Sequence, residues 1–367
     1  MFEKIKKNFG FGAMRLPMTD GRVDLEQTTQ MVDHFMASGF NYFDTAHMYL
    51  DGQSEPTLKH CLTSRYPRES YILTNKLSGS CFEFEEQIRP LFESQLKACG
   101  VEYFDFYLMH SQTRRIYQKF QDCRAYEIAM ELKKEGKVKH LGFSFHDGPE
   151  VLEQILTEHP EMEVVQLQFN YLDMEALNVQ SRACYEVCRK HNKPVIVMEP
   201  VKGGKLAQLS PKAHKIFADL GGGSDASYAV RYAAGYEGIM MVLSGMSNLA
   251  MVQDNCGYMQ DFQKLTPREL DAVAEVCRIL QQQEQIECTS CRYCTEGCPR
   301  QIPIPELFSC INKMNQGDPA YAAEYEKLIA EKGKKASDCV RCGACEKACP
   351  QHLPIRKLLQ SVADEFE

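Results

Sequence analysis

Two cysteine runs near the end of the chain share one spacing. The first is Cys288-x-x-Cys291-x-x-Cys294-x-x-x-Cys298-Pro299, and the second is Cys339-x-x-Cys342-x-x-Cys345-x-x-x-Cys349-Pro350. Three thiolates spaced by two residues can surround one cubane iron–sulfur cluster, and the fourth, carried past a proline, is placed to bind a second cluster. The spacing therefore predicts two [4Fe-4S] clusters with crossed ligands. One set is Cys288, Cys291, Cys294 and Cys349, and the other is Cys339, Cys342, Cys345 and Cys298.

Structural zinc is the competing interpretation of these cysteines. Four thiolates can hold a tetrahedral zinc ion, and Cys-x-x-Cys pairs are common in zinc sites. Zinc sites usually take their two pairs from separated segments, whereas here four cysteines and a proline are compressed into a short stretch twice. The spacing therefore favours clusters over zinc.

Four polar residues stand at or just after the ends of β-rich runs in the first third of the chain. Asp44, Lys76 and His110 close three successive runs, and Tyr49 follows Asp44 by five residues. Taken singly, each has an ordinary explanation, such as a helix cap, a solvated charge or a packed aromatic ring. Their joint placement at strand ends instead predicts one catalytic group formed by all four.

The elements that must position this group alternate in type. From residue 9 to about residue 245, short β-rich runs alternate with amphipathic helical stretches, which indicates βα units and a parallel sheet. The eight runs are Phe9–Met14, Phe40–Asp44, Tyr71–Asn75, Phe104–Met109, Val138–Ser144, Val164–Gln168, Pro194–Met198 and Gly238–Leu243. Eight such units predict an α/β fold of the (β/α)8 TIM barrel type. A doubly wound Rossmann sheet is the alternative, but Arg15 stands where the third glycine of its fingerprint would fall.

A second, smaller domain should follow the barrel. We expect the barrel to occupy residues 1–265, a linker helix residues 266–283, and the cysteine-rich domain residues 284–367. Thr266 and Pro267 provide an N-cap and a first-turn proline for the linker helix. Helical periodicity over Ile304–Met314 and Ala320–Ala330 predicts a mainly helical, ferredoxin-like dicluster domain.

Composition limits where the protein works and what it binds. The chain has 367 residues, 17 cysteines and a formal net charge of −8. Its length, the absence of a signal-peptide pattern and the cysteine spacing predict a reducing compartment, the cytoplasm, rather than a secreted disulfide scaffold. No run approaches the ~18 to 20 apolar residues that span a bilayer, so we expect no membrane span. The negative charge argues against a nucleic-acid partner.

Residues 8–258 resemble the aldo-keto reductase family. The family tetrad of Asp, Tyr, Lys and His occupies the places of Asp44, Tyr49, Lys76 and His110 in this order, and further similarity covers Gly142–Ser144, Val165–Asn170 and Leu243–Asn248. Together with the cysteine runs, the chain resembles iron–sulfur aldo-keto reductases. The resemblance implies an oxidoreductase that uses NADPH or NADH on a small-molecule carbonyl or alcohol substrate.

The residue types suit that chemistry. Hydride transfer to a carbonyl leaves an alkoxide that needs a proton, and Tyr49 can supply it if its pKa falls from about 10 toward the working pH. The ammonium of Lys76 would lower that pKa, and Asp44 would hold Lys76 in place. His110 can donate a hydrogen bond to the substrate oxygen and stabilise developing charge there.

The resemblance also implies a nicotinamide site. It assigns Ser144 and Gln166 to the carboxamide, and the segments 200–206 and 244–255 to the pyrophosphate and adenosine. The cofactor-binding residues of these segments are Pro200, Gly203, Gly204, Ser244, Gly245, Asn248 and Asn255. The backbone N–H groups of the two neighbouring glycines could approach phosphate, although a surface turn explains them as well. Met251 and Gly245 stand where family cations often grip the 2′-phosphate, so NADPH and NADH both remain open.

The purpose of the clusters stays open between three hypotheses. A nicotinamide delivers two electrons as hydride, whereas each cluster accepts one. The first hypothesis, which we favour, is a reductase whose clusters exchange single electrons with a redox partner protein or serve as redox-sensitive structure. The second is an electron-transfer protein whose barrel binds a flavin or another acceptor. The third is a reductase in which the clusters are purely structural.

Overall fold

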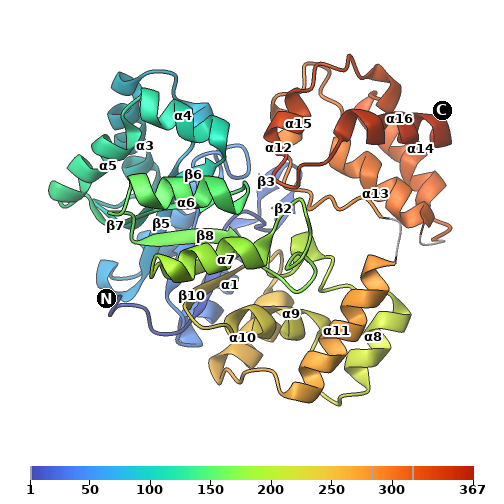
Figure 1. Cartoon of the computed structure of the whole chain (residues 1–367), viewed down its shortest axis with the longest axis horizontal. Coiled ribbons are helices and arrows are strands. Elements are labelled where there is room, and N and C mark those ends of the chain that lie inside the picture. The colour runs from blue at the N-terminus through green and yellow to red at the C-terminus, as the bar shows by residue number, and fades with distance from the viewer. Residues whose placement is uncertain (1, 283–284, 316–317) are drawn as a thin grey trace.

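The computed structural model describes residues 2–282, 285–315 and 318–367. Eight parallel strands form a closed barrel in the order β1-β10-β9-β8-β7-β6-β5-β4, seen from its side in Figure 1. The strands are β1 (Phe9–Gly12), β4 (Tyr42–Asp44), β5 (Ile72–Leu77), β6 (Phe104–Gln112), β7 (Val138–Phe145), β8 (Val164–Gln168), β9 (Val195–Met198) and β10 (Ile239–Gly245). Each predicted β-rich run overlaps one of them, so the TIM-barrel prediction is confirmed.

Helices surround this barrel. They are α1 (Leu25–Ala37), α2 (Ser54–Leu58), α3 (Ile88–Cys99), α4 (Arg114–Asp122), α5 (Ala125–Lys134), α6 (Pro149–Glu158), α7 (Ser181–Lys190), α8 (Pro211–Ala218), α9 (Asp225–Ala234) and α10 (Leu249–Gln260). Shorter turns are the π-helix η1 (Lys59–Thr63) and the 3-10 turns η2 (Arg68–Ser70), η3 (Gly79–Cys81), η4 (Glu85–Gln87) and η5 (Lys202–Gly204). In α1, the Asp24 carboxylate caps the first turn, while Met31, Val32 and Phe35 bury one face.

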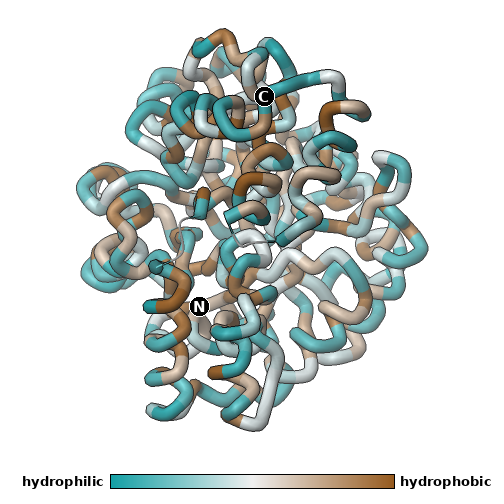
Figure 2. Tube along the Cα trace, turned by 90° about the vertical axis from the view of Figure 1, so that its right-hand side faces the viewer, coloured by the Kyte–Doolittle hydropathy of each residue, from teal (hydrophilic) through white to brown (hydrophobic). Residues whose placement is uncertain are grey.

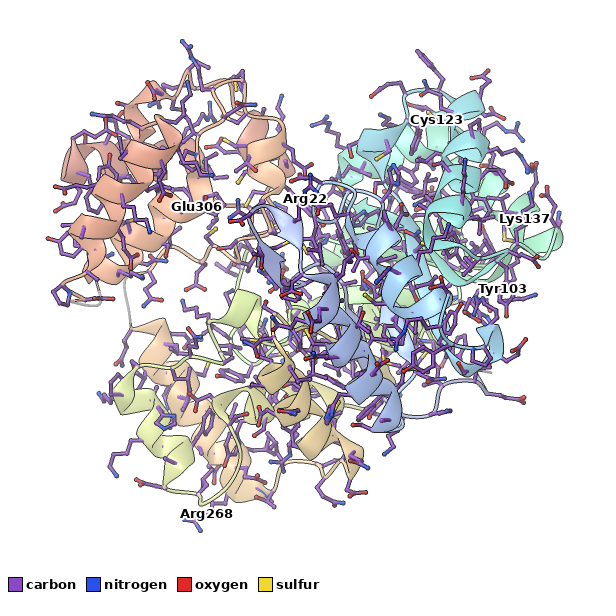
Figure 3. All side chains as sticks on the ribbon, turned by 180° about the vertical axis from the view of Figure 1, so that it is seen from behind. Arg22, Tyr103, Cys123, Lys137, Arg268 and Glu306 are labelled. Atoms are coloured by element: carbon purple, nitrogen blue, oxygen red, sulfur yellow. The ribbon has the colours of Figure 1, made fainter. Side chains whose placement is uncertain are left out.

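A small hairpin after β1 was not predicted. Strands β2 (Met18–Thr19) and β3 (Arg22–Val23) pair antiparallel. They follow the C-terminal end of β1 and therefore lie at the face of the barrel where active sites of this fold are found. Figure 3 places Arg22 beside the C-terminal lobe. Two-residue strands carry too little periodicity to be recognised from sequence.

Two apolar layers hold the barrel together. Its interior is filled by the side chains of Tyr42, Ile72, Phe106, Leu108, Val164, Ile196, Met241 and Leu243. A larger cluster lies between the strands and the surrounding helices, because alternate strand residues point outward. Figure 2 shows hydrophobic and hydrophilic residues alternating along the chain, as expected of elements with one buried face.

The C-terminal lobe is mainly helical, as predicted. Its elements are α12 (Tyr293–Glu296), α13 (Ile304–Asn315), α14 (Tyr321–Lys332), the 3-10 turn η6 (Ala336–Asp338), α15 (Ala344–Ala348) and α16 (Ile355–Phe366). It has its own core, centred on Ile304, Leu307, Phe308, Leu359 and Val362. We call this lobe, residues 285–367, the cluster domain. Across the described residues, every helix is too short or too polar to cross a membrane.

The helix before the cluster domain packs on the barrel. Helix α11 (Pro267–Gln281) begins after the predicted N-cap Thr266 and contacts α8 and α9. The side chains of Thr266 and Glu269 each cap the backbone N–H of the other, which was not predicted. In Figure 3 its first turn, marked by Arg268, lies at the bottom of the view, well below Glu306 of the cluster domain. The predicted end of this linker at residue 283 and the predicted domain start at residue 284 lie outside the described residues.

Gly142 tests the packing of the barrel wall. A Cβ atom at this position in β7 would lie 2.3 Å from the backbone oxygen of Val164. Gly142→Ala should therefore destabilise the fold by about 3 kcal/mol, because backbone must move. The matched control is Gly257→Ala in α10, where nothing lies within 4 Å and alanine should stabilise by about 0.5–1 kcal/mol. Only Gly142→Ala should lower the melting temperature, measured by far-UV circular dichroism during thermal unfolding. Equal melting temperatures in the two variants would contradict this packing.

Candidate active site

Three of the four predicted catalytic residues form one hydrogen-bonded chain at the C-terminal ends of β4 and β5. The Nζ atom of Lys76 lies 2.5 Å from Oδ1 of Asp44 and 3.1 Å from the hydroxyl of Tyr49. It also donates to the backbone oxygen of Thr45 at 2.9 Å. Asp44 ends β4 and Lys76 lies near the end of β5, while Tyr49 is on the loop after β4. The barrel thus assembles side chains that the sequence separates by up to 32 residues.

His110 completes the group from β6. Its Nδ1 atom lies 2.7 Å from the hydroxyl of Ser78, and its ring meets that of Tyr49 edge-on at 5.9 Å. Burial, followed by the charge of Lys76, lowers the pKa of His110 well below its usual value. The imidazole is therefore neutral at physiological pH. If Ser78 donates to Nδ1, the N–H of His110 is on Nε2, directed into the site.

Burial dominates the electrostatics of the other three residues. It raises the pKa of Asp44 and lowers the pKa of Lys76, while the attraction between the two opposes both shifts. Burial and then the charge of Asp44 raise the pKa of Tyr49 well above 10. The sequence predicts that the Lys76 ammonium lowers this pKa, whereas the structure gives the opposite direction, because desolvation of the phenolate dominates and the charge of Asp44 adds to it. Tyr49 is therefore a protonated phenol, the form that can donate a proton.

A cavity of about 810 Å³ opens above these residues. Asp44, Tyr49 and His110 line it, and Lys76 lies just beneath its surface, fully buried. All nine predicted cofactor-binding residues line the same cavity: Ser144, Gln166, Pro200, Gly203, Gly204, Ser244, Gly245, Asn248 and Asn255. Its size lies within the range of small-molecule and cofactor sites.

Neighbouring residues hold several of these side chains in place. Ser144 Oγ accepts from the backbone N–H of Ser111 at 2.7 Å, and Gln166 Nε2 donates to Asp44 at 3.3 Å. Asn255 Nδ2 donates to Ser244 Oγ at 3.0 Å. The side chain of Asn248 caps α10. These contacts orient the polar groups in advance of any ligand.

The two adjacent glycines have a different environment from the one predicted. The N–H of Gly203 donates to Oε2 of Glu199 at 2.5 Å, and that of Gly204 donates to the backbone oxygen of Val201 at 3.0 Å. A Cβ atom at position 203 would lie 2.6 Å from the backbone oxygen of Thr289. Both donors are thus already engaged, and Gly203 is required for the close contact with the cluster domain.

Arg15 is a residue of the cavity that the sequence did not reveal. Its side chain covers Gly245, because a Cβ atom there would lie 3.0 Å from Arg15 Cδ. Its guanidinium pairs with Glu199 at 3.4 Å and donates to the backbone oxygen of Thr289 at 2.7 Å. In the sequence, Arg15 is notable only because it replaces the third glycine of a Rossmann fingerprint. Its partners lie 184 and 274 residues away, so no short-range pattern predicts these contacts.

Each predicted cysteine set lines a cavity of its own in the cluster domain. One cavity is lined by Cys288, Cys291, Cys294 and Cys349, and the other by Cys298, Cys339, Cys342 and Cys345. Helices α12 and α15 pack together, which brings the last cysteine of each run to the other set. Among the described residues, no three His, Cys, Asp or Glu side chains converge to hold a single metal ion. Each set instead surrounds a space.

The two cysteine runs also share a backbone hydrogen bond. The N–H of Ser290 donates to Sγ of Cys288 at 3.4 Å, and the N–H of Arg341 donates to Sγ of Cys339 at 3.4 Å. Both donors lie two residues after the first cysteine of their run, and both residues have positive φ. N–H groups directed at sulfur stabilise thiolate charge, which is one of the factors that set cluster potentials.

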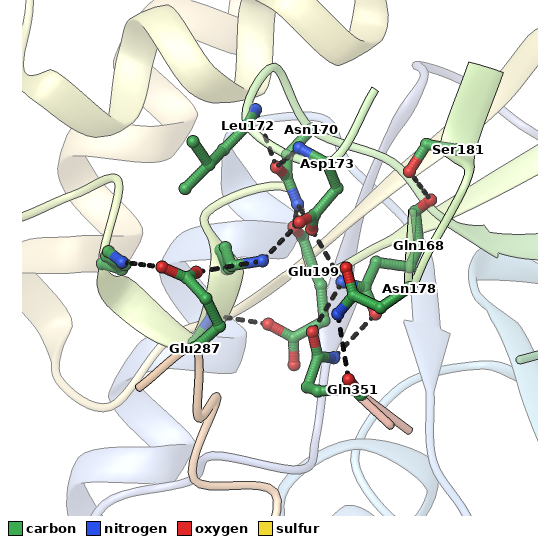
Figure 4. Close-up of polar contacts among 12 residues, drawn as sticks. Gln168, Asn170, Leu172, Asp173, Asn178, Ser181, Glu199, Glu287 and Gln351 are labelled. Atoms are coloured by element: carbon green, nitrogen blue, oxygen red, sulfur yellow. Dashed lines mark hydrogen bonds and ion pairs between the residues drawn. The ribbon is translucent and has the colours of Figure 1, made fainter. Parts of the chain in front are cut away.

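The cluster domain closes over the barrel through buried polar contacts, shown in Figure 4. The amides of Gln168 and Gln351 exchange two hydrogen bonds, at 3.1 and 2.8 Å. Lys202, only 3% exposed, pairs with Asp173 and, at 3.3 Å, with Glu287 of the cluster domain. Because the cluster domain sits on the C-terminal face of the barrel, Cys288, Thr289, Ser290, Cys291 and Tyr293 line the catalytic cavity.

The fold and the site define the chain as a (β/α)8-barrel enzyme with an attached cysteine-rich domain. Residues 8–278 match the model of the aldo/keto reductase family, and residues 287–353 match that of a 4Fe-4S dicluster domain. The chain therefore belongs to the aldo/keto reductase family and is an oxidoreductase.

Known proteins similar to the chain share its barrel. The chain is 26% identical to the NADH-specific methylglyoxal reductase of Escherichia coli over 209 residues, 52% of this chain and 61% of that enzyme. It is 26% identical to the 9,11-endoperoxide prostaglandin H2 reductase of Trypanosoma cruzi over 69% of this chain and 83% of that enzyme. An aldo-keto reductase structure from Bacillus halodurans matches with a TM-score of 0.59 at 22% identity, covering 73% of this chain and 91% of its own. A Klebsiella pneumoniae aldo-keto reductase in complex with NADPH matches with a TM-score of 0.57 at 18% identity, covering 74% and 90%. These two structural matches show the shared fold.

Lys202→Met tests the buried polar network of Lys202, Asp173 and Glu287. Lys202→Met would leave the Asp173 carboxylate, 1% exposed, without its cation, and should cost about 3–5 kcal/mol. The control is Lys205→Met, which removes a partner of the more exposed Glu287 and should cost about 1 kcal/mol or less. Thermal unfolding of the iron-loaded proteins checks the difference. Equal losses in the two variants would contradict a costly buried ion pair beneath the cluster domain.

Proposed function

We propose that the chain reduces the carbonyl of an aldehyde or ketone by hydride transfer from NADPH or NADH, or oxidises the corresponding alcohol. The observation that carries this proposal is the contact of Tyr49 with the buried Lys76–Asp44 pair, beside His110, in the cavity that all nine expected cofactor-binding residues line. A family relationship alone would not require these side chains to meet.

The residues would divide the chemistry between them. The nicotinamide, when bound, supplies the hydride. Tyr49, a protonated phenol, would donate its proton to the substrate oxygen as negative charge develops there. Lys76 would stabilise the resulting phenolate at 3.1 Å, and neutral His110 would donate a hydrogen bond from Nε2 to the same oxygen.

The residues around the cavity suit a nicotinamide dinucleotide. Ser144 and Gln166 offer hydroxyl and amide groups beside Asp44 for the carboxamide. The 200–206 and 244–255 segments lie along the remainder of the cavity. Met251, 40% exposed, stands where a cation for a 2′-phosphate is expected, so we propose that NADH is accepted as well as NADPH.

We further propose two [4Fe-4S] clusters, one in each cysteine-lined cavity, that exchange single electrons with a redox partner protein in the cytoplasm. The eight cysteines supply the four thiolates that each cluster needs. Cys288 and Cys291 line both a cluster cavity and the catalytic cavity. This shared wall supports a second candidate, an electron-transfer protein whose barrel binds a flavin or another acceptor. The absorbance spectrum of cofactor extracted from anaerobically purified protein would separate the two.

Tyr49→Phe tests the reductase proposal. Loss of the proton donor should reduce kcat for aldehyde reduction by about 10²–10⁴-fold, while quenching of NADH fluorescence reports unchanged cofactor affinity. Tyr107→Phe is the control, because Tyr107 is also a buried tyrosine and its hydroxyl hydrogen-bonds to Gln95, outside the cavity. Wild-type turnover by Tyr49→Phe would overturn the proposed reaction.

Serine variants of Cys349 and Cys298 test the crossed ligand sets. Each should lose one cluster, which reduces iron from about eight to about four per chain, and the electron paramagnetic resonance signals that disappear should differ between the two. Cys310→Ser, a change at a buried cysteine of α13 outside both cavities, should keep all the iron. Loss of the same signal in Cys349→Ser and Cys298→Ser would contradict two separate sets.

A further inference from the structure

Tyr293 brings the cluster domain into contact with the catalytic residues. It is the first residue of α12, between Cys291 and Cys294 in the sequence. Its hydroxyl lies 3.5 Å from Nε2 of His110, and the two rings meet edge-on at 6.3 Å. Tyr49, His110 and Tyr293 line the same cavity.

The contact with His110 coincides with a group that a substrate would use. If the proposed reaction holds, a carbonyl oxygen must lie within reach of both the Tyr49 hydroxyl and His110 Nε2. The Tyr293 hydroxyl contacts His110 Nε2 in the cavity that Tyr49 also lines. A phenol oxygen can accept a hydrogen bond as a carbonyl oxygen does, so it can satisfy the N–H of His110.

The first cysteine run differs from the second at this position. Arg292 and Tyr293 separate Cys291 from Cys294, whereas Gly343 and Ala344 hold the equivalent places in the second run. A glycine and an alanine are sufficient to connect two cysteines of the same spacing. The large side chain therefore has a task beyond connecting the ligands of a cluster, and its contacts are with the barrel.

We propose that the Tyr293 hydroxyl occupies the position of the substrate oxygen and must be displaced when a carbonyl binds. Tyr293 is then a specificity-determining residue, because only a substrate that replaces its contact with His110 and fits beside its ring can reach Tyr49. The proposal rests on the proposed function for the location of the substrate oxygen. The adjoining cavity, which Tyr293 itself lines, leaves room for the ring to turn while the neighbouring cysteines keep their places.

A hydroxyl that competes with the ligand and one that helps to bind it have opposite effects when removed. Tyr293→Phe keeps the ring and deletes the oxygen. Loss of a competitor should tighten the binding of a small oxygen ligand by about two- to tenfold, the effect of one hydrogen bond. Loss of a helpful third donor should weaken it by a similar factor.

Calorimetry with hexanoate measures this without turnover. Its carboxylate places an oxygen at Tyr49 and His110, and the iron-loaded, NAD⁺-bound protein is titrated as wild type, as Tyr293→Phe and as Tyr325→Phe. Tyr325 is the control, because its hydroxyl contacts Glu367 on the far side of the cluster domain. We expect tighter binding only for Tyr293→Phe, with unchanged iron content. Unchanged or weaker binding would overturn the proposal.

A spectroscopic signal gives a second readout. The chain has no tryptophan, so a near-ultraviolet difference spectrum on hexanoate binding reports tyrosine environments. Wild type should show a tyrosine difference that shrinks in Tyr293→Phe, because its phenol leaves a buried site. An equal difference in the two proteins would contradict displacement. Failure of the reductase proposal would instead show as wild-type turnover by Tyr49→Phe, which these binding measurements do not use.

Discussion

The buried ammonium of Lys76 is the constraint on which the site depends. The side chain is 0% exposed, and an unpaired charge at such a place would cost several kcal/mol. All three groups that satisfy it, Asp44, the Thr45 carbonyl and Tyr49, come from β4 or the loop after it. In the sheet, Asp44 pairs with Thr74, two residues before Lys76. The contacts of Lys76 therefore exist only in the observed register of β4 and β5. A slip of one residue would turn Lys76 to the opposite face of the sheet.

The docking of the cluster domain also depends on buried polar groups that need specific partners. Lys202, buried among Asp173 and Glu287, and the paired amides of Gln168 and Gln351 have few arrangements that satisfy every polar group. A purely apolar interface could slide with little loss, whereas a half-satisfied buried polar network is costly. This requirement favours a single position for the cluster domain on the barrel, and with it a single position for the loop that lines the catalytic cavity.

The features that the sequence predicted are those encoded by short-range patterns. Alternation of β-rich and helical stretches identifies all eight strands, and the ends of those strands point to Asp44, Lys76 and His110, which the fold brings together. Cysteine spacing groups the residues that line each cavity of the cluster domain, and the roles of these residues stay predictions. Contacts between distant segments were out of reach, as for Arg15 and Tyr293, whose partners lie 274 and 183 residues away. The prediction that the pKa of Tyr49 is lowered was wrong for a related reason. Neighbouring charges can be inferred from a sequence, but the degree of desolvation depends on the packed structure.

The catalytic cavity and one cysteine-lined cavity share a wall. Cys288, Thr289, Cys291 and Gln351 line both, so one layer of residues separates a ligand at Tyr49 from the sulfur atoms of that set. Within this wall, Arg292 and Tyr293 have different partners, because Arg292 pairs with Glu306 of α13 whereas Tyr293 contacts His110. The loop between Cys291 and Cys294 therefore contacts the cluster domain through Arg292 and the barrel through Tyr293. A change of loop conformation at Cys291 or Cys294 must then move Tyr293, so the conformation of this cysteine loop and the space at His110 are coupled through covalent neighbours rather than through a distant pathway.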